Sequence, residues 1–388
     1  MNHSWKLHFS RFLTTRPQRL HVAAHSHHPW PDVSFDAQMQ AWLDAAERID
    51  GKWQAIFDTL IPAAQAHVAT ILHLPDPSTI CFAGNTHELF MRAISAIEKP
   101  VLRVLSTDSE FHSFNRQLQR FEEAGKAVIE RVPAEPFTSF AERFAAAAAR
   151  GGHDLVYFSQ CFYNSGWLVH ELVPLVGAVR DPSTLVIIDG YHGYMAVHTD
   201  LSAIAGRAFY LAGGYKYAMS GEGNAFIHCP PGQALRPVDT GWFAGFAALT
   251  AGPARVGYAD GGLRFMGGTY DPTGLYRLNA VMDWLHAQKL TPARIHARVA
   301  ALQEQFLDGL DRLSLPALNG SLLIPGRGQP RGNFLCFRTP RASELQALLK
   351  AAEVICDCRD DRLRIGFGVY HDAGDVGELL RRIAISLA

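Results

Sequence analysis

The chain has no uninterrupted apolar run near the roughly 18–20 residues that a membrane-spanning helix requires. Its first residues lack the apolar core of a secretory signal, so we expect a cytoplasmic protein that does not associate with membranes. Neither sign of charge dominates, because 36 lysines and arginines oppose 37 aspartates and glutamates and leave a formal net charge of −1. So small an excess of charge gives no electrostatic reason to expect nucleic acid as a partner.

Cysteine is scarce, with six residues in a chain of 388. So few cysteines do not form a disulfide framework in a chain of this length. Cys356 and Cys358 are separated by a single residue, unlike the usual zinc or redox spacing, and we expect both to be reduced. No Gly-x-Gly-x-x-Gly opens a helix after a first strand, which excludes a nicotinamide-dependent Rossmann enzyme.

Short apolar runs and amphipathic runs alternate in the middle of the chain, which is long enough for two domains. The predicted strands are 79–83, 101–105, 155–159, 184–189, 208–212 and 224–229. This alternation predicts an α/β fold with a mostly parallel sheet and helices on both faces.

Weaker signals describe the two ends of the chain. Residues 35–71 have helical apolar spacing, and 251–268 are glycine-rich and predicted to be irregular. Helices over 274–315, 342–352 and 373–386, with strands at 332–338 and 362–368, predict a smaller α+β domain. We therefore predict an arm over 1–50 that lines the active site, a large domain over 51–272 and a small domain over 273–388.

The most informative stretch is 211–229, where Lys216 lies between two tyrosines and is flanked by glycines. Glycine lets the backbone adopt positive φ and approach a ligand closely. A lysine in so tight a turn is expected to be partly buried, which lowers the pKa of its ammonium and frees the amine as a nucleophile. A glycine-rich hairpin that carries a surface lysine is the alternative.

Two strand ends carry further polar residues. Gly84-Asn-Thr86 separates a predicted strand from a helix, so it offers backbone N–H groups and a hydroxyl to a phosphate at the positive helix end. An ordinary N-cap is the alternative for Asn85 and Thr86. The apolar run 184–189 ends in Asp189, with His192 close behind, and ligands of α/β sheets bind at such strand ends.

Pyridoxal 5′-phosphate requires such a set of residues. It needs a lysine that bonds to it, a carboxylate that keeps its pyridine nitrogen protonated, a side chain that stacks on its ring and a helix N-terminus for its phosphate. Phe111 is a candidate for stacking, and Arg364 could grip the carboxylate of an amino-acid substrate bidentately.

The N-terminal stretch 20–32 is rich in histidine, proline and tryptophan. His25, His27 and His28 could suggest a metal site, but the prolines favour an extended segment, and no carboxylate–histidine set at helical spacing accompanies them. We predict no metal, and a loop that lines a pocket. Together with Tyr270 these histidines are candidates for acid–base work, and a hydrogen-bonded structural role is the alternative for each.

In their order along the chain, these motifs resemble the aminotransferase class V group of fold-type-I pyridoxal phosphate enzymes, and within it the kynureninases. The segment 215–223 is similar to the kynureninase lysine motif, and Asp189-Gly-Tyr-His192 is similar to the family's Asp-x-x-His. The resemblance implies Lys216, Asp189 and His192 as catalytic residues, with Asp189 at the pyridine nitrogen and His192 beside the ring.

The resemblance also implies a homodimer and a set of ligand contacts. The implied cofactor contacts are Asn85, Thr86, Phe111, Ser159, Asp189, His192, Tyr215, Lys216, Trp242 and Thr269, with one or both of Trp242 and Thr269 supplied from a partner subunit. Arg364, in a stretch similar to the family's C-terminal signature, is the implied carboxylate clamp. We expect His25, His28 and Tyr270 to contact the substrate as well.

The implied reaction is hydrolytic Cβ–Cγ cleavage of a kynurenine-type amino acid, and transamination with a keto acid is the alternative. The chain departs from the family around the substrate, since Gly-Thr-Pro-Pro is replaced by Gly268-Thr-Tyr-Asp-Pro272 and the N-terminal substrate loop by His25–Pro31. A desulfurase or selenocysteine lyase needs a thiol on a mobile loop, whereas Cys336 lies in an apparent buried strand. A non-catalytic relative would need neither Lys216 nor Arg364.

Overall fold

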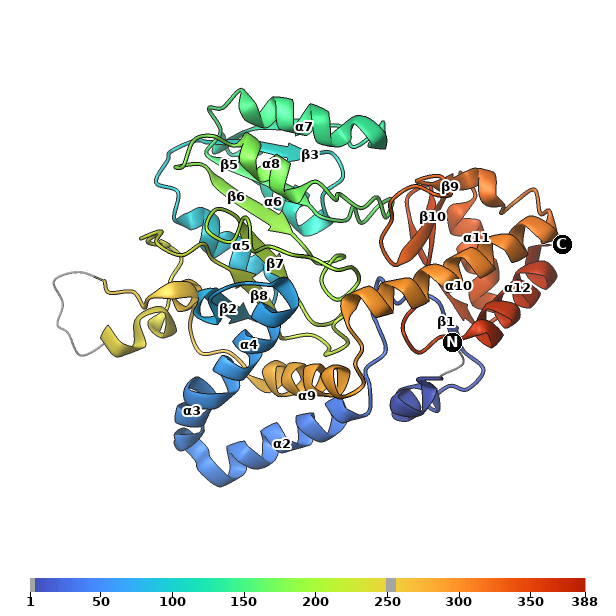
Figure 1. The fold of residues 1–388 in the computed structure, drawn as a ribbon, viewed down its shortest axis with the longest axis horizontal. Helices are drawn as coiled ribbons and strands as arrows, with labels where there is room; N and C mark the ends of the chain where they lie inside the picture. Colours follow the sequence, from blue (N-terminus) through green and yellow to red (C-terminus); the bar gives the residue numbers. More distant parts are fainter. Residues whose placement is uncertain (1–3, 249–255, 388) are drawn as a thin grey trace.

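The computed structural model describes residues 4–248 and 256–387, so part of the stretch 251–268 lies outside the described residues. Figure 1 shows a large body built around one twisted sheet and a smaller body that holds both chain termini. Helix α10 (Pro292–Leu313) runs from one body to the other.

The large body contains a seven-stranded sheet in the order β2-β8-β7-β6-β5-β3-β4. Its strands are β2 (Ile80–Ala83), β3 (Leu102–Thr107), β4 (Ala127–Val132), β5 (Leu155–Ser159), β6 (Leu185–Asp189), β7 (Phe209–Ala212) and β8 (Ala225–His228). Strands β3 to β7 pair in parallel, whereas β8 is antiparallel to both of its neighbours. The predicted mostly parallel sheet is confirmed.

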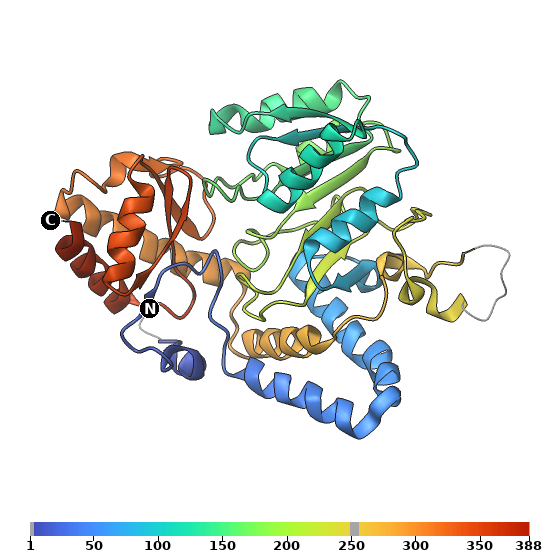
Figure 2. The ribbon, with the colours of Figure 1, turned by 180° about the vertical axis from the view of Figure 1, so that it is seen from behind.

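Burial explains which strands the sequence predicted. The first four residues of β6, Leu-Val-Ile-Ile, are all buried, as expected for a central strand covered on both faces. Strand β4 was not predicted, because it lies at the sheet edge and carries the charged residues Glu130 and Arg131. Helices α5 (Thr86–Ser95) and α6 (His112–Glu123) lie before the sheet in Figure 2, and α8 (Leu172–Ala178) before it in Figure 1. Helices therefore cover both faces.

A nearly continuous helical stretch, Val33–Leu72, precedes the sheet and is long and apolar enough to cross a membrane by length and composition alone. It comprises α2 (Val33–Arg48), α3 (Lys52–Ala55) and α4 (Ile61–Leu72), with a π-helical turn at Ile56–Leu60. Both α2 and α4 pack against α9 (Thr273–Ala287), and α4 buries most of its apolar side chains there, whereas several large apolar side chains of α2 stay exposed. The helix predicted over 274–315 is divided into α9 and α10, because Thr291 caps α10 and Pro292 begins it.

The small body is built on a four-stranded antiparallel sheet in the order β12-β13-β10-β9. Its strands and remaining helices are β9 (Leu323–Ile324), β10 (Phe334–Arg338), β12 (Asp357–Arg359), β13 (Arg362–Gly366), α11 (Ala342–Ala351) and α12 (Ala373–Leu387). The N-terminal segment joins it, since β1 (Leu20–His21) pairs in parallel with β11 (Val354–Ile355). Figure 2 shows this segment passing from the small body to α2. The division at 50 and 272 stays a prediction.

Candidate active site

Lys216 lies in the turn after β7, and only 5% of it is exposed, which excludes a surface lysine. Its Nζ lies 2.9 Å from Nε2 of His192. The rings of Phe111, Tyr191 and Tyr215 have centroids 4.9–5.7 Å from Nζ. Burial is the main reason that the pKa of Lys216 falls to about 7. A large share of the amine is therefore neutral near neutral pH.

Asp189 ends the neighbouring strand β6, so its carboxylate lies at the same sheet edge as Lys216. It accepts hydrogen bonds from the Tyr157 hydroxyl and the Tyr191 N–H, each 2.9 Å long. Burial raises the pKa of Asp189, and both hydrogen bonds oppose that rise. Burial and the neighbouring Lys216 also lower the pKa of His192, so this ring is neutral.

The sequence did not reveal a second buried carboxyl group beside Asp189. Glu110 is 0% exposed and accepts hydrogen bonds from the Thr107 hydroxyl (2.7 Å), the Ser159 N–H (3.1 Å) and the Ser159 hydroxyl. Burial raises the pKa of Glu110 to about 8, and the charge of Asp189 adds to the rise. The available sequence signal was an acidic residue directly before Phe111, which does not by itself indicate burial.

Arg364 lies on β13 and is buried with its guanidinium against two acceptors. It donates to the Tyr163 carbonyl and to the carboxylate of Asp357, its cross-strand neighbour on β12. Its Nε has no hydrogen-bond partner among the described residues. Asp357 also lies 3.1 Å from Arg359, and the sequence did not reveal its role.

The N-terminal segment brings His25 into this group of side chains. The ring stacks on Phe334 with 4.7 Å between centroids, and Nε2 lies 3.6 Å from Asp357 Oδ2, too far for a hydrogen bond. Neither ring nitrogen has a hydrogen-bond partner within residues 4–248 and 256–387. Burial lowers the pKa of His25 to about 4, so the ring is neutral at pH 7.

His28 and Tyr270 are the two other residues predicted to contact the substrate. The Nδ1 of His28 is 2.7 Å from the Pro29 carbonyl, its ring packs edge-on against Tyr370, and burial lowers its pKa to about 3. The Tyr270 hydroxyl is buried, and burial raises its pKa well above the ordinary value. His28 thus has a hydrogen bond and a ring contact of its own, the Tyr270 hydroxyl has no hydrogen-bond partner among the described residues, and the substrate contacts of both stay predictions.

The predicted phosphate residues divide into two groups. Asn85 caps α5, since its Oδ1 accepts from Glu88 N–H at 3.0 Å and its Nδ2 donates to Glu88 Oε1 at 2.7 Å. Thr86 opens the helix, whose first N–H groups have no acceptor within it. Trp242 donates a 3.0 Å hydrogen bond to Thr269, and both side chains are exposed.

These residues fit pyridoxal phosphate. Strand β2 runs parallel to β7, because both are antiparallel to β8, so the N-terminus of α5 lies at the same sheet edge as Asp189 and Lys216. The carboxyl ends of these strands thus bring together the Lys216 amine, the Asp189 carboxylate, the ring of Phe111 and the positive N-terminus of α5. No group of three or more metal-ligating side chains occurs within the described ranges.

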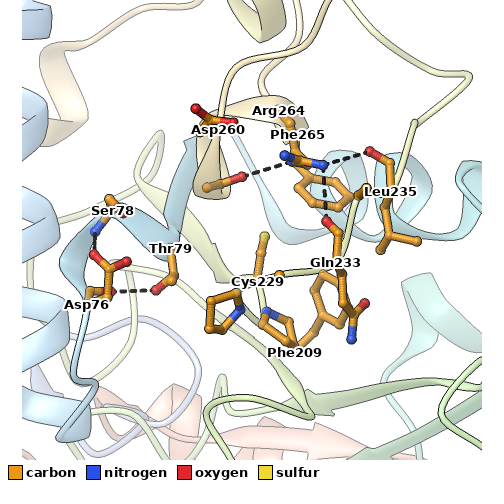
Figure 3. Close-up of a pocket in the computed structure, with 15 residues that line it drawn as sticks. Asp76, Ser78, Thr79, Phe209, Cys229, Gln233, Leu235, Asp260, Arg264 and Phe265 are labelled. Atoms are coloured by element: carbon orange, nitrogen blue, oxygen red, sulfur yellow. Dashed lines mark hydrogen bonds between the residues drawn. The ribbon is translucent and has the colours of Figure 1, made fainter.

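A pocket of about 330 Å³ lies at the opposite edge of the sheet (Figure 3). Thr79 precedes β2 and Phe209 begins β7, so both pocket residues lie at amino ends of strands. Arg264 there donates to the carbonyls of Gln233 and Leu235, at 3.0 and 3.2 Å. Backbone contacts occupy this arginine, and the pocket is separate from the Lys216 site.

The fold and the buried lysine–carboxylate pair define the class of protein, a pyridoxal-phosphate-dependent enzyme of fold type I. The chain belongs to the aminotransferase class-V family, whose sequence model matches residues 36–354. The structure is similar to C-DES, a cystine C–S lyase, in a mutant with glycine covalently linked to its PLP cofactor (TM-score 0.83, 18% identity, 98% of each chain). It is also similar to the apo cysteine desulfurase of Thermococcus onnurineus NA1 (TM-score 0.82, 16% identity, 100% of this chain and 99% of that one).

Two curated relatives are similar in sequence. One is the uncharacterized aminotransferase YcbU of Bacillus subtilis (strain 168), 23% identical over 57% of this chain and 56% of that protein. The other is isopenicillin N epimerase of Streptomyces clavuligerus, 25% identical over 56% of this chain and 54% of that protein. The chain thus spans about half the length of the curated relatives it matches. The predicted family and cofactor are confirmed, and the kynureninase subtype stays a prediction.

Proposed function

We propose that this enzyme acts at the α-carbon of an amino acid and hydrolyses a Cβ–Cγ bond of a kynurenine-type side chain. The observation that supports this most is a second neutral base, His25, buried on the Arg364 side of the site. Hydrolysis at a side-chain carbonyl needs a group that takes a proton from water, whereas transamination can proceed with the lysine alone.

In this proposal the chain binds the cofactor at both ends. Lys216 would bond to it, Asp189 would keep a proton on its ring nitrogen, and Phe111 would stack on the ring. The N-terminus of α5 would hold its phosphate, with Thr86 as a hydroxyl donor. When bound, the protonated ring supplies a sink for the electron pair left at the α-carbon. Three more residues would contact the cofactor. His192 and Tyr215 lie beside Lys216, and Ser159 is the last residue of β5.

The substrate is held and deprotonated by residues of both bodies. Arg364 binds the α-carboxylate with its unpartnered Nε and its remaining N–H groups. Lys216, once free, accepts the α-proton, because its lowered pKa leaves it neutral near pH 7. His192, 2.9 Å from Nζ, holds the free amine in position. His25 then takes a proton from the attacking water.

Transamination is the second candidate, favoured by the similarity to the aminotransferase YcbU. The desulfurase alternative has less support from the cysteines, all six of which lie in the described part of the chain. Five are buried, and Cys358 lies in strand β12 rather than on a loop.

We also propose a homodimer, in keeping with the sequence prediction. Large apolar side chains are exposed on α2, where Trp42 is 66% exposed, and on η6 (Trp242–Ala248), where Trp242 is 42% and Phe246 47% exposed. Apolar and aromatic surface of this kind is typical of subunit interfaces. A partner seated there would cover the Trp242–Thr269 pair.

The test is an absorbance spectrum of the purified protein before and after L-kynurenine, 3-hydroxykynurenine and L-alanine. We expect a visible cofactor band that is lost in Lys216→Ala and kept in Lys350→Ala, an exposed lysine on α11. Release of anthranilate from kynurenine supports hydrolysis, and conversion of the cofactor to its amine form supports transamination. A protein that takes up no pyridoxal phosphate refutes the proposal.

A further inference from the structure

Glu110 connects two neighbouring strands, β3 and β5, at the carboxyl ends where the cofactor is proposed to bind. Its Oε1 accepts from the hydroxyl of Thr107, the last residue of β3, and from the N–H of Ser159, the last residue of β5. Its Oε2 is hydrogen-bonded to the Ser159 hydroxyl. Ser159 is in turn paired in register with Asp189 on β6.

The proton of Glu110 decides which way the Ser159 hydroxyl points. A carboxylate only accepts hydrogen bonds, whereas a carboxylic acid also has one O–H to donate. If Glu110 is ionised, Ser159 must turn its hydrogen toward Oε2. If Glu110 carries a proton, it can donate that proton to Ser159 Oγ, and the Ser159 hydrogen is then free to donate to a bound molecule.

The surroundings favour the protonated form of Glu110. The titratable groups that face it are Asp189 on β6 and Tyr157 on β5, and neither brings a positive charge. Hydrogen-bond donors reach both carboxyl groups, but the nearby Lys216 amine opposes the rise that burial causes in the pKa of Asp189, so Asp189 is the better place for one negative charge. Two buried carboxyl groups so close together do not both ionise readily.

We propose that Glu110 is a positioning residue whose proton directs the Ser159 hydroxyl toward bound pyridoxal phosphate and leaves the negative charge of the pair on Asp189. This inference rests on the proposed function, because the contact between Ser159 and the cofactor is part of it. Glutamine copies the protonated state, since its amide N–H donates to Ser159 Oγ and its carbonyl accepts from Thr107 and the Ser159 N–H. Glu110→Gln is therefore locked in the binding form.

The experiment measures the dissociation constant of pyridoxal phosphate by fluorescence titration of the apo-protein, at intervals from about pH 7 to about pH 9. In the wild-type protein, loss of the Ser159 donor should weaken binding about tenfold over this range, beyond any change seen in Glu110→Gln. Ser159→Ala should bind weakly at every pH and lack this extra dependence. Thr107→Val removes a bond that favours the ionised form, so its transition should move to higher pH.

A second measurement needs no cofactor. An ordinary glutamate loses its proton near pH 4.5 in the unfolded chain, whereas folded Glu110 keeps it up to about pH 8. The folded wild type therefore loses stability relative to Glu110→Gln as pH rises between these values. The difference in melting temperature between the two apo-proteins should widen over this range and then stay constant.

Two results would overturn the role of Glu110. One is parallel loss of affinity in the wild type and Glu110→Gln, and the other is a wild-type pH dependence that persists in Ser159→Ala. A wild-type protein that binds no pyridoxal phosphate at any pH overturns the proposed function itself. Normal uptake with parallel titrations leaves that function standing and overturns this inference alone.

Discussion

Replacing Asp357 by asparagine tests the buried pair at the substrate side of the site. The carboxylate is flanked by Arg364 and Arg359, and only 9% of its side chain is exposed. Burial alone would raise the pKa of Asp357, but the charges of Arg364 and Arg359 oppose burial, and the pKa lies well below its ordinary value. The folded protein therefore gains stability from this carboxylate above the ordinary aspartate pKa and loses it as pH falls below that value.

Removing one partner of a buried ion pair costs about 3–5 kcal/mol, because the remaining charge is left uncompensated. We expect Asp357→Asn to lower the free energy of unfolding by about 3 kcal/mol at pH 7, the lower end of that range, since the amide oxygen still accepts from Arg364. Urea unfolding followed by circular dichroism measures this loss. The difference from wild type should shrink as pH falls through the ordinary aspartate range.

Asp361→Asn is the matched control, because Asp361 pairs with Arg362 at 3.4 Å but its side chain is 51% exposed. Its loss should change the free energy of unfolding by no more than about 1 kcal/mol. Equal effects of the two substitutions, or an Asp357→Asn effect that is the same at pH 7 and in acid, would refute the assignment of Asp357 as a buried charge partner of Arg364.

Three further predictions concern the chemistry. Turnover should rise with pH through about 7 and then level off, because Lys216 accepts a proton only when neutral; a flat pH–rate profile would contradict this. Asp189→Asn should lower kcat roughly a hundredfold and leave much of the cofactor binding, since a neutral amide no longer keeps the ring nitrogen protonated; absorbance titration and steady-state rates separate the two effects. His25→Gln should slow side-chain cleavage and spare exchange of the substrate α-proton with deuterated water, which NMR follows; equal loss of both would give His25 a purely structural role.

Local patterns were enough to locate the main strands and to single out Asp189 and Lys216 as candidates. The apolar composition of β6 predicted a buried strand that ends at Asp189. The glycine-flanked Lys216 is also buried, as expected. Asn85 was predicted to contact phosphate, with an ordinary N-cap as the alternative; the structure shows the cap, which depends on residues three positions apart, and the phosphate contact stays a prediction. Thr291 and Pro292 are local signals for the break between α9 and α10, although we predicted helix throughout 274–315.

Only the tertiary structure decided which polar groups share a buried environment. Glu110 meets Ser159 across 49 positions, and Arg364 meets Tyr163 across 201, because strands or bodies distant in sequence are adjacent in space. The tertiary structure also separates two histidines that are three positions apart, since His25 lies beside Asp357 whereas His28 packs against Tyr370. Sequence specifies the chemical type of each side chain. Burial and partners, which set its protonation and role, arise when the strands assemble.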